Sequence, residues 1–132
     1  MSANQKRPVY KNIHVFDLVN YRLPIPGIIS ILHRITGASM FLLIPMFLAL
    51  LQMSLKSEAG YEAFKAMVWG NIFAKLFLLG LLYFFVHHFC CGIRYLLLDT
   101  HRGIDLVSAR NSSKAVVFVS VLVSILLVVK LW

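Results

Sequence analysis

Acidic residues are scarce in this sequence, and charged residues of either sign are few. Asp and Glu number 5 against 13 Lys and Arg, so the 132-residue chain carries a net charge of +8, with only 14% of its residues charged. Apolar residues make up 60% of the chain, which is more than the interior of a soluble domain of this size can enclose. Soluble globular classes are therefore excluded, and lipid must surround most of the chain.

The excess positive charge indicates topology. No stripe of basic residues interleaved with aromatics is present, so we exclude nucleic acid as a partner. The basic residues concentrate before the first apolar stretch and between the second and third, namely Lys6, Arg7, Lys11, Arg22, Arg102, Arg110 and Lys114. The positive-inside rule then predicts a cytoplasmic N-terminus and second loop, with the C-terminus outside.

Cysteine and targeting signals are also sparse. Cys90 and Cys91 are adjacent within an apolar stretch and point about 100° apart on a helix, so we expect two packing residues and no disulfide between them. The polar N-terminal segment has neither an apolar signal core nor an amphipathic Arg/Ser presequence. These features favour a bacterial inner membrane over a mitochondrial inner membrane.

Three apolar stretches predict transmembrane helices at about 28–55, 72–98 and 115–131. Residues 35–55 and 76–93 carry no charge, and a helix needs about 20 apolar residues to cross a bilayer core. Pro24 and Pro26 predict an irregular segment, with at most one short helical stretch, before a helix that begins after Gly27. Pro45 is expected to kink the first helix. The expected fold is all-α: one domain over residues 1–132, an integral membrane three-helix bundle with loops at 56–69 and 99–114.

His88 stands in the middle of the second apolar stretch. It precedes Leu98 by ten residues, about 15 Å of helix or half a bilayer core. An ionisable residue at that depth needs a partner and indicates a function. Imidazole is a common axial ligand of haem iron, and Gly92, one turn on, leaves room for a flat macrocycle. On spacing alone, haem ligation and a hydrogen bond to a neighbouring helix remain equal alternatives.

The other histidines are expected to play different parts. His87 points about 100° away from His88 and cannot ligate the same iron, so we expect it to pack or to contact a partner. His14 and His101 lie outside the membrane core, and His33 is expected at a different depth from His88. If a low-spin haem is bound, its second ligand must come from a partner helix, and the chain forms half of a cofactor site.

The segment SILHRITG, residues 30–37, gathers polar groups at the start of the first helix. Ser30 and Arg34 share a helix face, and His33 is adjacent. The guanidinium of Arg34 matches a carboxylate and could also polarise a carbonyl oxygen. Snorkelling to phosphate headgroups is the equally weighted alternative.

Arg94 lies one turn inside the end of the second helix, on the same side of the membrane as Arg34, and could reach the same anion. The polar residues that follow it are expected to form a solvated or subunit-docking surface; they are Asp99, His101, Arg102 and Asp105.

These motifs resemble a known family. RP near the N-terminus, SILHRITG opening the first helix and HHFCCGIRYLLLD closing the second are similar to the large cytochrome b anchor subunit of succinate dehydrogenase. The pair H-R-x-[ST]-G and H-x-x-x-G-I-R is more specific than either half, and the resemblance covers essentially the whole chain.

The resemblance implies a role for each matching residue. His88 matches the axial ligand of haem b, whose other ligand comes from the second, smaller anchor subunit. His33 and Arg34 match residues near the haem propionates. Ser30 and Ile31, with Arg34, match the ubiquinone pocket.

Two further positions follow from the same resemblance. Arg94 matches the Arg of G-I-R, a propionate or structural contact. Tyr95 replaces a histidine found in many members, and a phenol does not relay protons at neutral pH as imidazole can.

The resemblance thus implies a membrane anchor for a flavoprotein and an iron–sulfur subunit, passing electrons from succinate to ubiquinone. The chain itself would not oxidise succinate. Two alternatives remain: a small transporter or proton channel using His87, His88 and Arg34, and a haem-free structural anchor, including that of a fumarate reductase.

Overall fold

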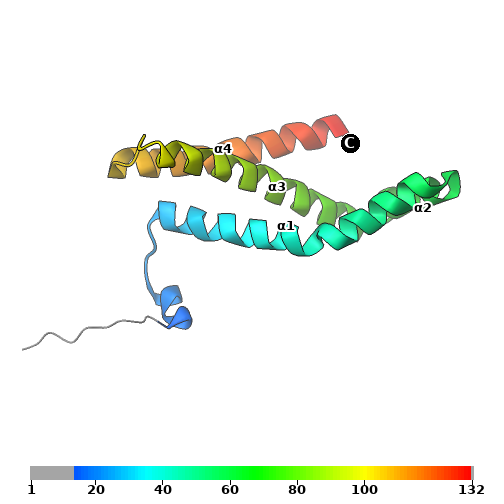
Figure 1. The fold of residues 1–132 in the computed structure, drawn as a ribbon, viewed down its shortest axis with the longest axis horizontal. Coiled ribbons are helices and arrows are strands. Elements are labelled where there is room, and N and C mark those ends of the chain that lie inside the picture. The colour runs from blue at the N-terminus through cyan, green and yellow to red at the C-terminus, as the bar shows by residue number, and fades with distance from the viewer. Residues whose placement is uncertain (1–13, 132) are drawn as a thin grey trace, which may run out of the picture.

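The computed structural model describes residues 14–131, which are helical apart from short connections (Figure 1). A short 3₁₀ helix, η1, spans Val15–Asn20. Four α-helices follow, with bounds α1 Ile25–Lys56, α2 Glu58–Gly70, α3 Ile72–Asp99 and α4 Leu106–Leu131. The basic residues Lys6, Arg7 and Lys11, on which the predicted orientation partly depends, lie outside the described residues.

Three of these helices are long and apolar enough to cross a membrane, namely Ile25–Lys56, Ile72–Asp99 and Leu106–Lys130. The predicted all-α transmembrane fold is therefore confirmed. Two connecting segments differ from expectation: the first expected loop is the helix α2, and α4 begins at Leu106 rather than near Ala115.

Helix α1 starts before the point that its prolines suggested. Pro26 occupies the first turn, where a backbone N–H has no partner within the helix, so its missing donor costs nothing. The N–H groups of Gly27 and Ile28 instead bond to the Pro24 carbonyl at 2.8 and 3.1 Å. The helix then continues through Pro45.

Polar side chains cap the starts of α2, α3 and α4. The Ser57 hydroxyl accepts from the Gly60 N–H at 3.1 Å and starts α2. The Asn71 side chain accepts from the Phe73 N–H at 2.9 Å and starts α3. At α4, a carboxylate oxygen of Asp105 accepts from the Ser108 N–H at 2.9 Å, and this bond lowers the pKa of Asp105.

Helix α3 packs against both α1 and α4. The start of α1, the end of α3 and the start of α4 meet at one end of the bundle, and α2 lies at the other (Figure 1). Ile29, Cys91 and Val116 form the core at the first end. The α4 side uses small residues, Ser113, Ser120 and Ser124, which are buried and bond to carbonyls of their own helix. Such residues let transmembrane helices approach closely.

Candidate functional site

His88 is half-buried on α3, and its ring faces α1. Its Nδ1 lies 3.1 Å from the backbone carbonyl oxygen of His33. A carbonyl oxygen only accepts, so Nδ1 carries the hydrogen and Nε2 keeps its lone pair. The Nε2 atom has no hydrogen-bond partner among the described residues. This arrangement suits a metal ligand, because ligating histidines generally donate their other N–H to a carbonyl or carboxylate.

Thr36 and Gly37 complete the seat of the His88 ring. The Thr36 hydroxyl lies 2.9 Å from the Leu32 carbonyl oxygen, to which it donates, and 3.3 Å from His88 Nδ1, from which it can accept. A Cβ added at Gly37 would lie 2.7 Å from His88 Cε1. Sequence reasoning did not assign either residue, although both belong to the SILHRITG segment.

His33 lies beside His88, which corrects the expectation that the two sit at different depths. Their rings stack with centroids 4.1 Å apart and planes 14° apart. His33 lies eight residues from the start of α1, about 12 Å of helix. His88 lies eleven residues from the end of α3, about 16 Å of helix, and both distances are measured from the same end of the bundle. The expectation failed because it placed the start of α1 too late and assumed aligned helix ends.

The stack does not make the two histidines a ligand pair. Imidazole lone pairs lie in the ring plane, so nearly parallel stacked rings cannot aim them at one ion between the faces. Tyr95 packs on His33, with the two ring centroids 5.1 Å apart. His33 Nε2 and the Tyr95 hydroxyl are both buried without a hydrogen-bond partner among the described residues. Two orphaned polar atoms at this place indicate an absent polar partner.

His87 faces α4 and is a packing residue, as predicted. It is 1% exposed, with Nδ1 3.3 Å from the Ser120 hydroxyl and Nε2 3.4 Å from Cys91 Sγ. Its ring also stacks near Tyr83, at 5.6 Å between centroids. Cys90 and Cys91 are free thiols, as expected.

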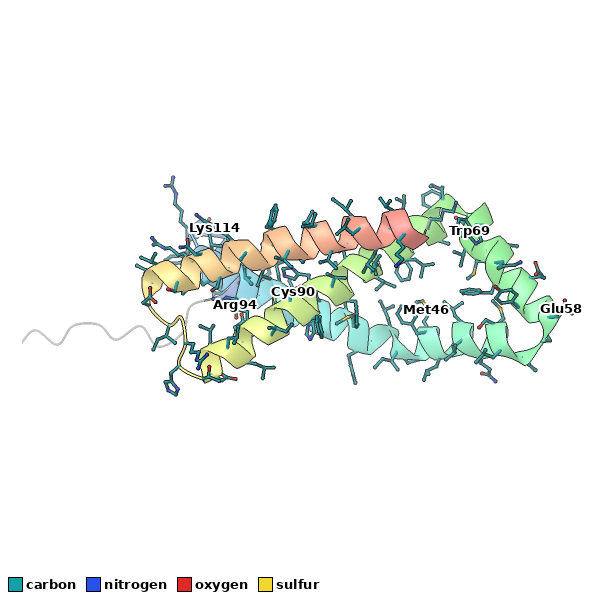
Figure 2. The ribbon with its side chains drawn as sticks, turned by 90° about the horizontal axis from the view of Figure 1, so that it is seen from above. Met46, Glu58, Trp69, Cys90, Arg94 and Lys114 are labelled. Carbon is teal, nitrogen blue, oxygen red and sulfur yellow. The ribbon has the colours of Figure 1, made fainter. Side chains whose placement is uncertain are left out.

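Arg94 is buried, at 6% exposure, against α4 (Figure 2). Its Nε donates to the Ser112 hydroxyl at 3.0 Å and its Nη2 to the Ala109 carbonyl at 3.3 Å. It makes no hydrogen bond to α1 within the part of the chain that the structure describes. These contacts favour the structural role among the two that the sequence allowed.

The remaining predicted residues lie on the first turns of α1. Ser30 is half-buried, whereas Ile31 and Arg34 are exposed. The Arg34 side chain forms no hydrogen bond or ion pair with the residues that the structure describes. Its charge is therefore available to a ligand or to headgroups at the end of the bundle.

The described residues contain no group of three or more His, Cys, Asp or Glu side chains that could hold a metal ion. A metal at His88 would thus need most of its ligands from outside this chain. Gly92, one turn along α3, has nothing within 4 Å of an added Cβ and leaves open space on that side.

Comparison with known proteins identifies the family. A model of the succinate dehydrogenase/fumarate reductase transmembrane subunit matches residues 4–127. The chain belongs to this family.

Full-length relatives agree with this assignment. The succinate dehydrogenase cytochrome b556 subunit of Coxiella burnetii (strain RSA 493 / Nine Mile phase I) is 30% identical over 129 residues, covering 98% of this chain and 99% of that protein. The subunit of the same name from Rickettsia felis (strain ATCC VR-1525 / URRWXCal2) is 30% identical over 122 residues, covering 92% and 90%. The chain is a multi-pass membrane subunit of the succinate dehydrogenase cytochrome b kind.

Proposed function

We propose that this subunit binds haem b together with a second small membrane-anchor subunit and forms part of a ubiquinone-reduction site. The single observation that carries the proposal is the orientation of His88. Its Nδ1–H donates to the His33 carbonyl, which leaves the Nε2 lone pair available, so His88 would hold the haem iron through Nε2. The names of the two relatives support the cofactor, because both are called cytochrome b556 subunits.

The residues present fit a haem. The porphyrin supplies four iron ligands itself, so one histidine is all that this chain has to provide. Open space at Gly92 and the unpartnered Tyr95 hydroxyl lie one and two turns from His88. When bound, haem supplies a one-electron carrier. The stack with His88 leaves His33 unable to bind the same iron, so a second protein ligand would be supplied by the partner subunit.

Charge complementarity supports the propionate contacts. Arg34 lies one residue from His33 and is unpaired among the described residues, and His33 Nε2 lacks a partner. These two residues would hold the haem carboxylates at the end of the bundle. Arg94 would act mainly by fixing α4 to α3, because two of its nitrogen atoms already bond to α4.

The quinone contacts rest on the start of α1. Ser30 offers a hydroxyl to a quinone carbonyl, Ile31 an apolar wall and Arg34 a fixed positive charge. Positive charge near the carbonyl oxygen favours the partly reduced, anionic quinone. These residues bind and orient the quinone head, while the chain performs no succinate chemistry.

Membership of the family supports a proposal for the larger assembly. The flavoprotein and iron–sulfur subunits would dock at the end where α1 begins and α4 starts, and electrons from succinate would reach ubiquinone there. The positive charge at this end supports a cytoplasmic location for it in a bacterial inner membrane, with the N-terminus cytoplasmic. A haem-free anchor of a fumarate reductase and a proton channel remain the competing functions.

A difference spectrum tests the proposal. The complex would be purified with its native subunits in mild detergent, and a dithionite-reduced minus oxidised visible spectrum recorded. We expect a sharp low-spin b-type α band that is lost in His88→Gln and kept in His87→Gln, the adjacent control. An intact, quinone-reducing complex without haem bands would overturn the haem assignment and leave a haem-free anchor.

A further inference from the structure

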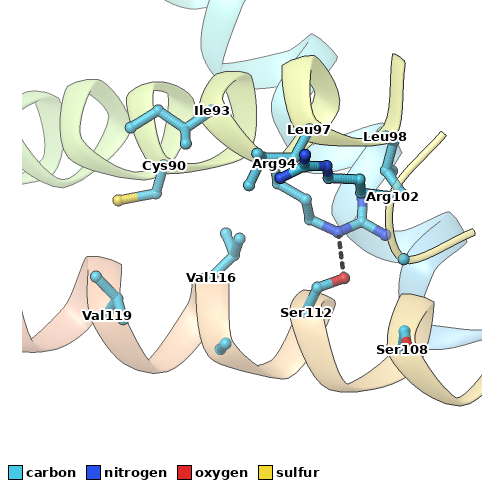
Figure 3. Close-up of a pocket in the computed structure, with 12 residues that line it drawn as sticks. Cys90, Ile93, Arg94, Leu97, Leu98, Arg102, Ser108, Ser112, Val116 and Val119 are labelled. Atoms are coloured by element: carbon cyan, nitrogen blue, oxygen red, sulfur yellow. Dashed lines mark hydrogen bonds between the residues drawn. The ribbon is translucent and has the colours of Figure 1, made fainter. Parts of the chain in front are cut away.

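A cavity of about 510 Å³ lies between α3 and α4 and shares Arg94 and Ser112 with the site just described (Figure 3). Its walls are mainly apolar, from residues such as Ile93, Leu97, Val116 and Val119. Its polar lining includes Arg94, Arg102, Ser108 and Ser112, and Figure 3 shows both arginine side chains reaching into the same end. The cavity is thus amphipathic, with positive charge at one end.

Arg94 is a buried cation without a counter-ion. It is 6% exposed, and it forms no ion pair with any carboxylate in the described part of the chain. No carboxylate of the described residues lines the cavity, and Asp105, in the α3–α4 loop, caps α4. Two of the five guanidinium N–H groups bond to α4, so three remain. The Ser112 hydroxyl, the Ala109 carbonyl and the Tyr95 ring, 5.4 Å from Arg94 Cζ, surround the guanidinium without neutralising its charge, so an anion from outside the chain would complete the site.

The cavity faces away from His88. Cys90, Ile93 and Leu97 line it, and they follow His88 by two, five and nine residues, which places them roughly 140–200° around α3. The seat of His88 on α1 lies on the opposite side of the helix. Most of the cavity therefore lies on the side of α3 away from His88, whereas its cationic end at Arg94 lies about 120° around the helix from His88.

The depth of the cationic end matches a headgroup. Arg94 is five residues from the end of α3, about 8 Å of helix, and the α3–α4 loop supplies Arg102. Anionic lipids occur in the cytoplasmic leaflet, on the side to which the positive-inside rule assigns this loop. The walls beyond Arg94 are apolar over two turns of α4, as an acyl chain requires.

We propose that the α3–α4 cavity binds an anionic phospholipid, with its phosphate between Arg94 and Arg102 and an acyl chain along Val116 and Val119. The lipid neutralises Arg94 and fills the α3–α4 cavity, beside the contact that the small serines of α4 make with α3. Arg102 selects for negative charge because it is exposed and its guanidinium has no hydrogen-bond partner among the described residues.

Lipid retention tests this site. The complex would be purified in mild detergent from membranes containing phosphatidylglycerol and phosphatidylethanolamine, and retained lipid quantified by mass spectrometry. Arg102→Gln should retain anionic lipid about fivefold more weakly, because one headgroup-proximal charge is removed. Arg110→Gln removes the same charge from an exposed residue outside the cavity and should retain lipid as the native chain does.

Two further readouts decide the occupant. A photoreactive phenylalanine analogue at position 119 should cross-link to phospholipid. Cross-linking to a protein subunit would overturn the proposal, as would equal retention of anionic lipid in all three proteins. Because the analogue is placed in the chain with Arg102 intact, cross-linking still tests the proposal if Arg102→Gln fails to assemble. A changed haem spectrum in Arg102→Gln would assign the cavity to the haem and contradict the lipid proposal. If the purified complex contains no haem and Arg102→Gln still reduces lipid retention, the haem proposal fails and the lipid proposal is upheld.

Discussion

The Nδ1 atom of His88 on α3 lies 3.1 Å from the backbone carbonyl oxygen of His33 on α1. This bond links two segments 55 positions apart and fixes the rotation of the His88 ring. It also determines which nitrogen is free. The same α1 segment that carries the proposed quinone contacts therefore orients the proposed iron ligand, so the two functions share one structural element.

Gly37 tests how closely α1 must approach this ring. Gly37→Ala would place a Cβ 2.7 Å from His88 Cε1 and 3.2 Å from Nδ1, and the ring would have to move. We expect the altered ring to lower haem affinity by about 10- to 100-fold, the range for disturbed outer-shell contacts. The measurement is the haem-to-protein ratio of the purified complex. Gly80→Ala is the control, because nothing lies within 4 Å of a Cβ at that position. Full haem occupancy in Gly37→Ala would contradict the proposed seat.

Thr36 supplies the second acceptor for the His88 N–H. Thr36→Val keeps the shape and removes the oxygen 3.3 Å from Nδ1. Because the His33 carbonyl remains, we expect a milder loss than for Gly37→Ala, at most about 10-fold in haem affinity, with a shifted haem midpoint potential. Potentiometric titration of the α band would measure it. Thr100→Val, at the exposed end of α3, should leave the potential unchanged; an equal shift in both variants would exclude a specific role for Thr36.

The membrane spans were predictable because residues 35–55 and 76–93 lack charge. The start of α4 was not, because its first turns are polar and only the Asp105 cap marks them. The helix α2 was missed for a similar reason, since the Ser57 cap is a weaker signal than an apolar stretch.

The candidate site was only partly predictable from the sequence. His88 stood out by its depth, and the resemblance supplied roles for the α1 residues. The stack of His33 on His88 depends on how far α1 is displaced along α3, which hydropathy does not encode. The burial of Arg94 against Ser112 likewise requires knowledge of the α3–α4 contact.

Ser120 supports His87 at the α3–α4 contact. Its hydroxyl lies 3.0 Å from the Val117 carbonyl oxygen, to which it donates, so it accepts from His87 Nδ1 at 3.3 Å. Ser120→Ala leaves a buried imidazole N–H without its partner, which costs about 1–3 kcal/mol. We expect a lower thermal midpoint for the purified complex with an unchanged haem spectrum. Ser54→Ala is the control, because the Ser54 hydroxyl bonds to the Leu51 carbonyl and to no other described residue. Haem loss in Ser120→Ala at intact assembly would instead assign His87 to the cofactor.

Asp105 makes the start of α4 sensitive to acid. Its pKa is lowered in the folded protein, chiefly by the hydrogen bond from the Ser108 N–H. A carboxyl with a depressed folded pKa stabilises the fold above its unfolded pKa of about 4, and the contribution is lost as pH falls through the lower folded value. Asp105→Asn keeps a capping oxygen without the charge, so the difference in thermal midpoint between native and variant complexes should shrink as pH falls from 6 to 3. Asp17→Asn, in η1, is the control for general acid effects. A difference that stays constant over this range would show that the charge of Asp105 does not stabilise α4.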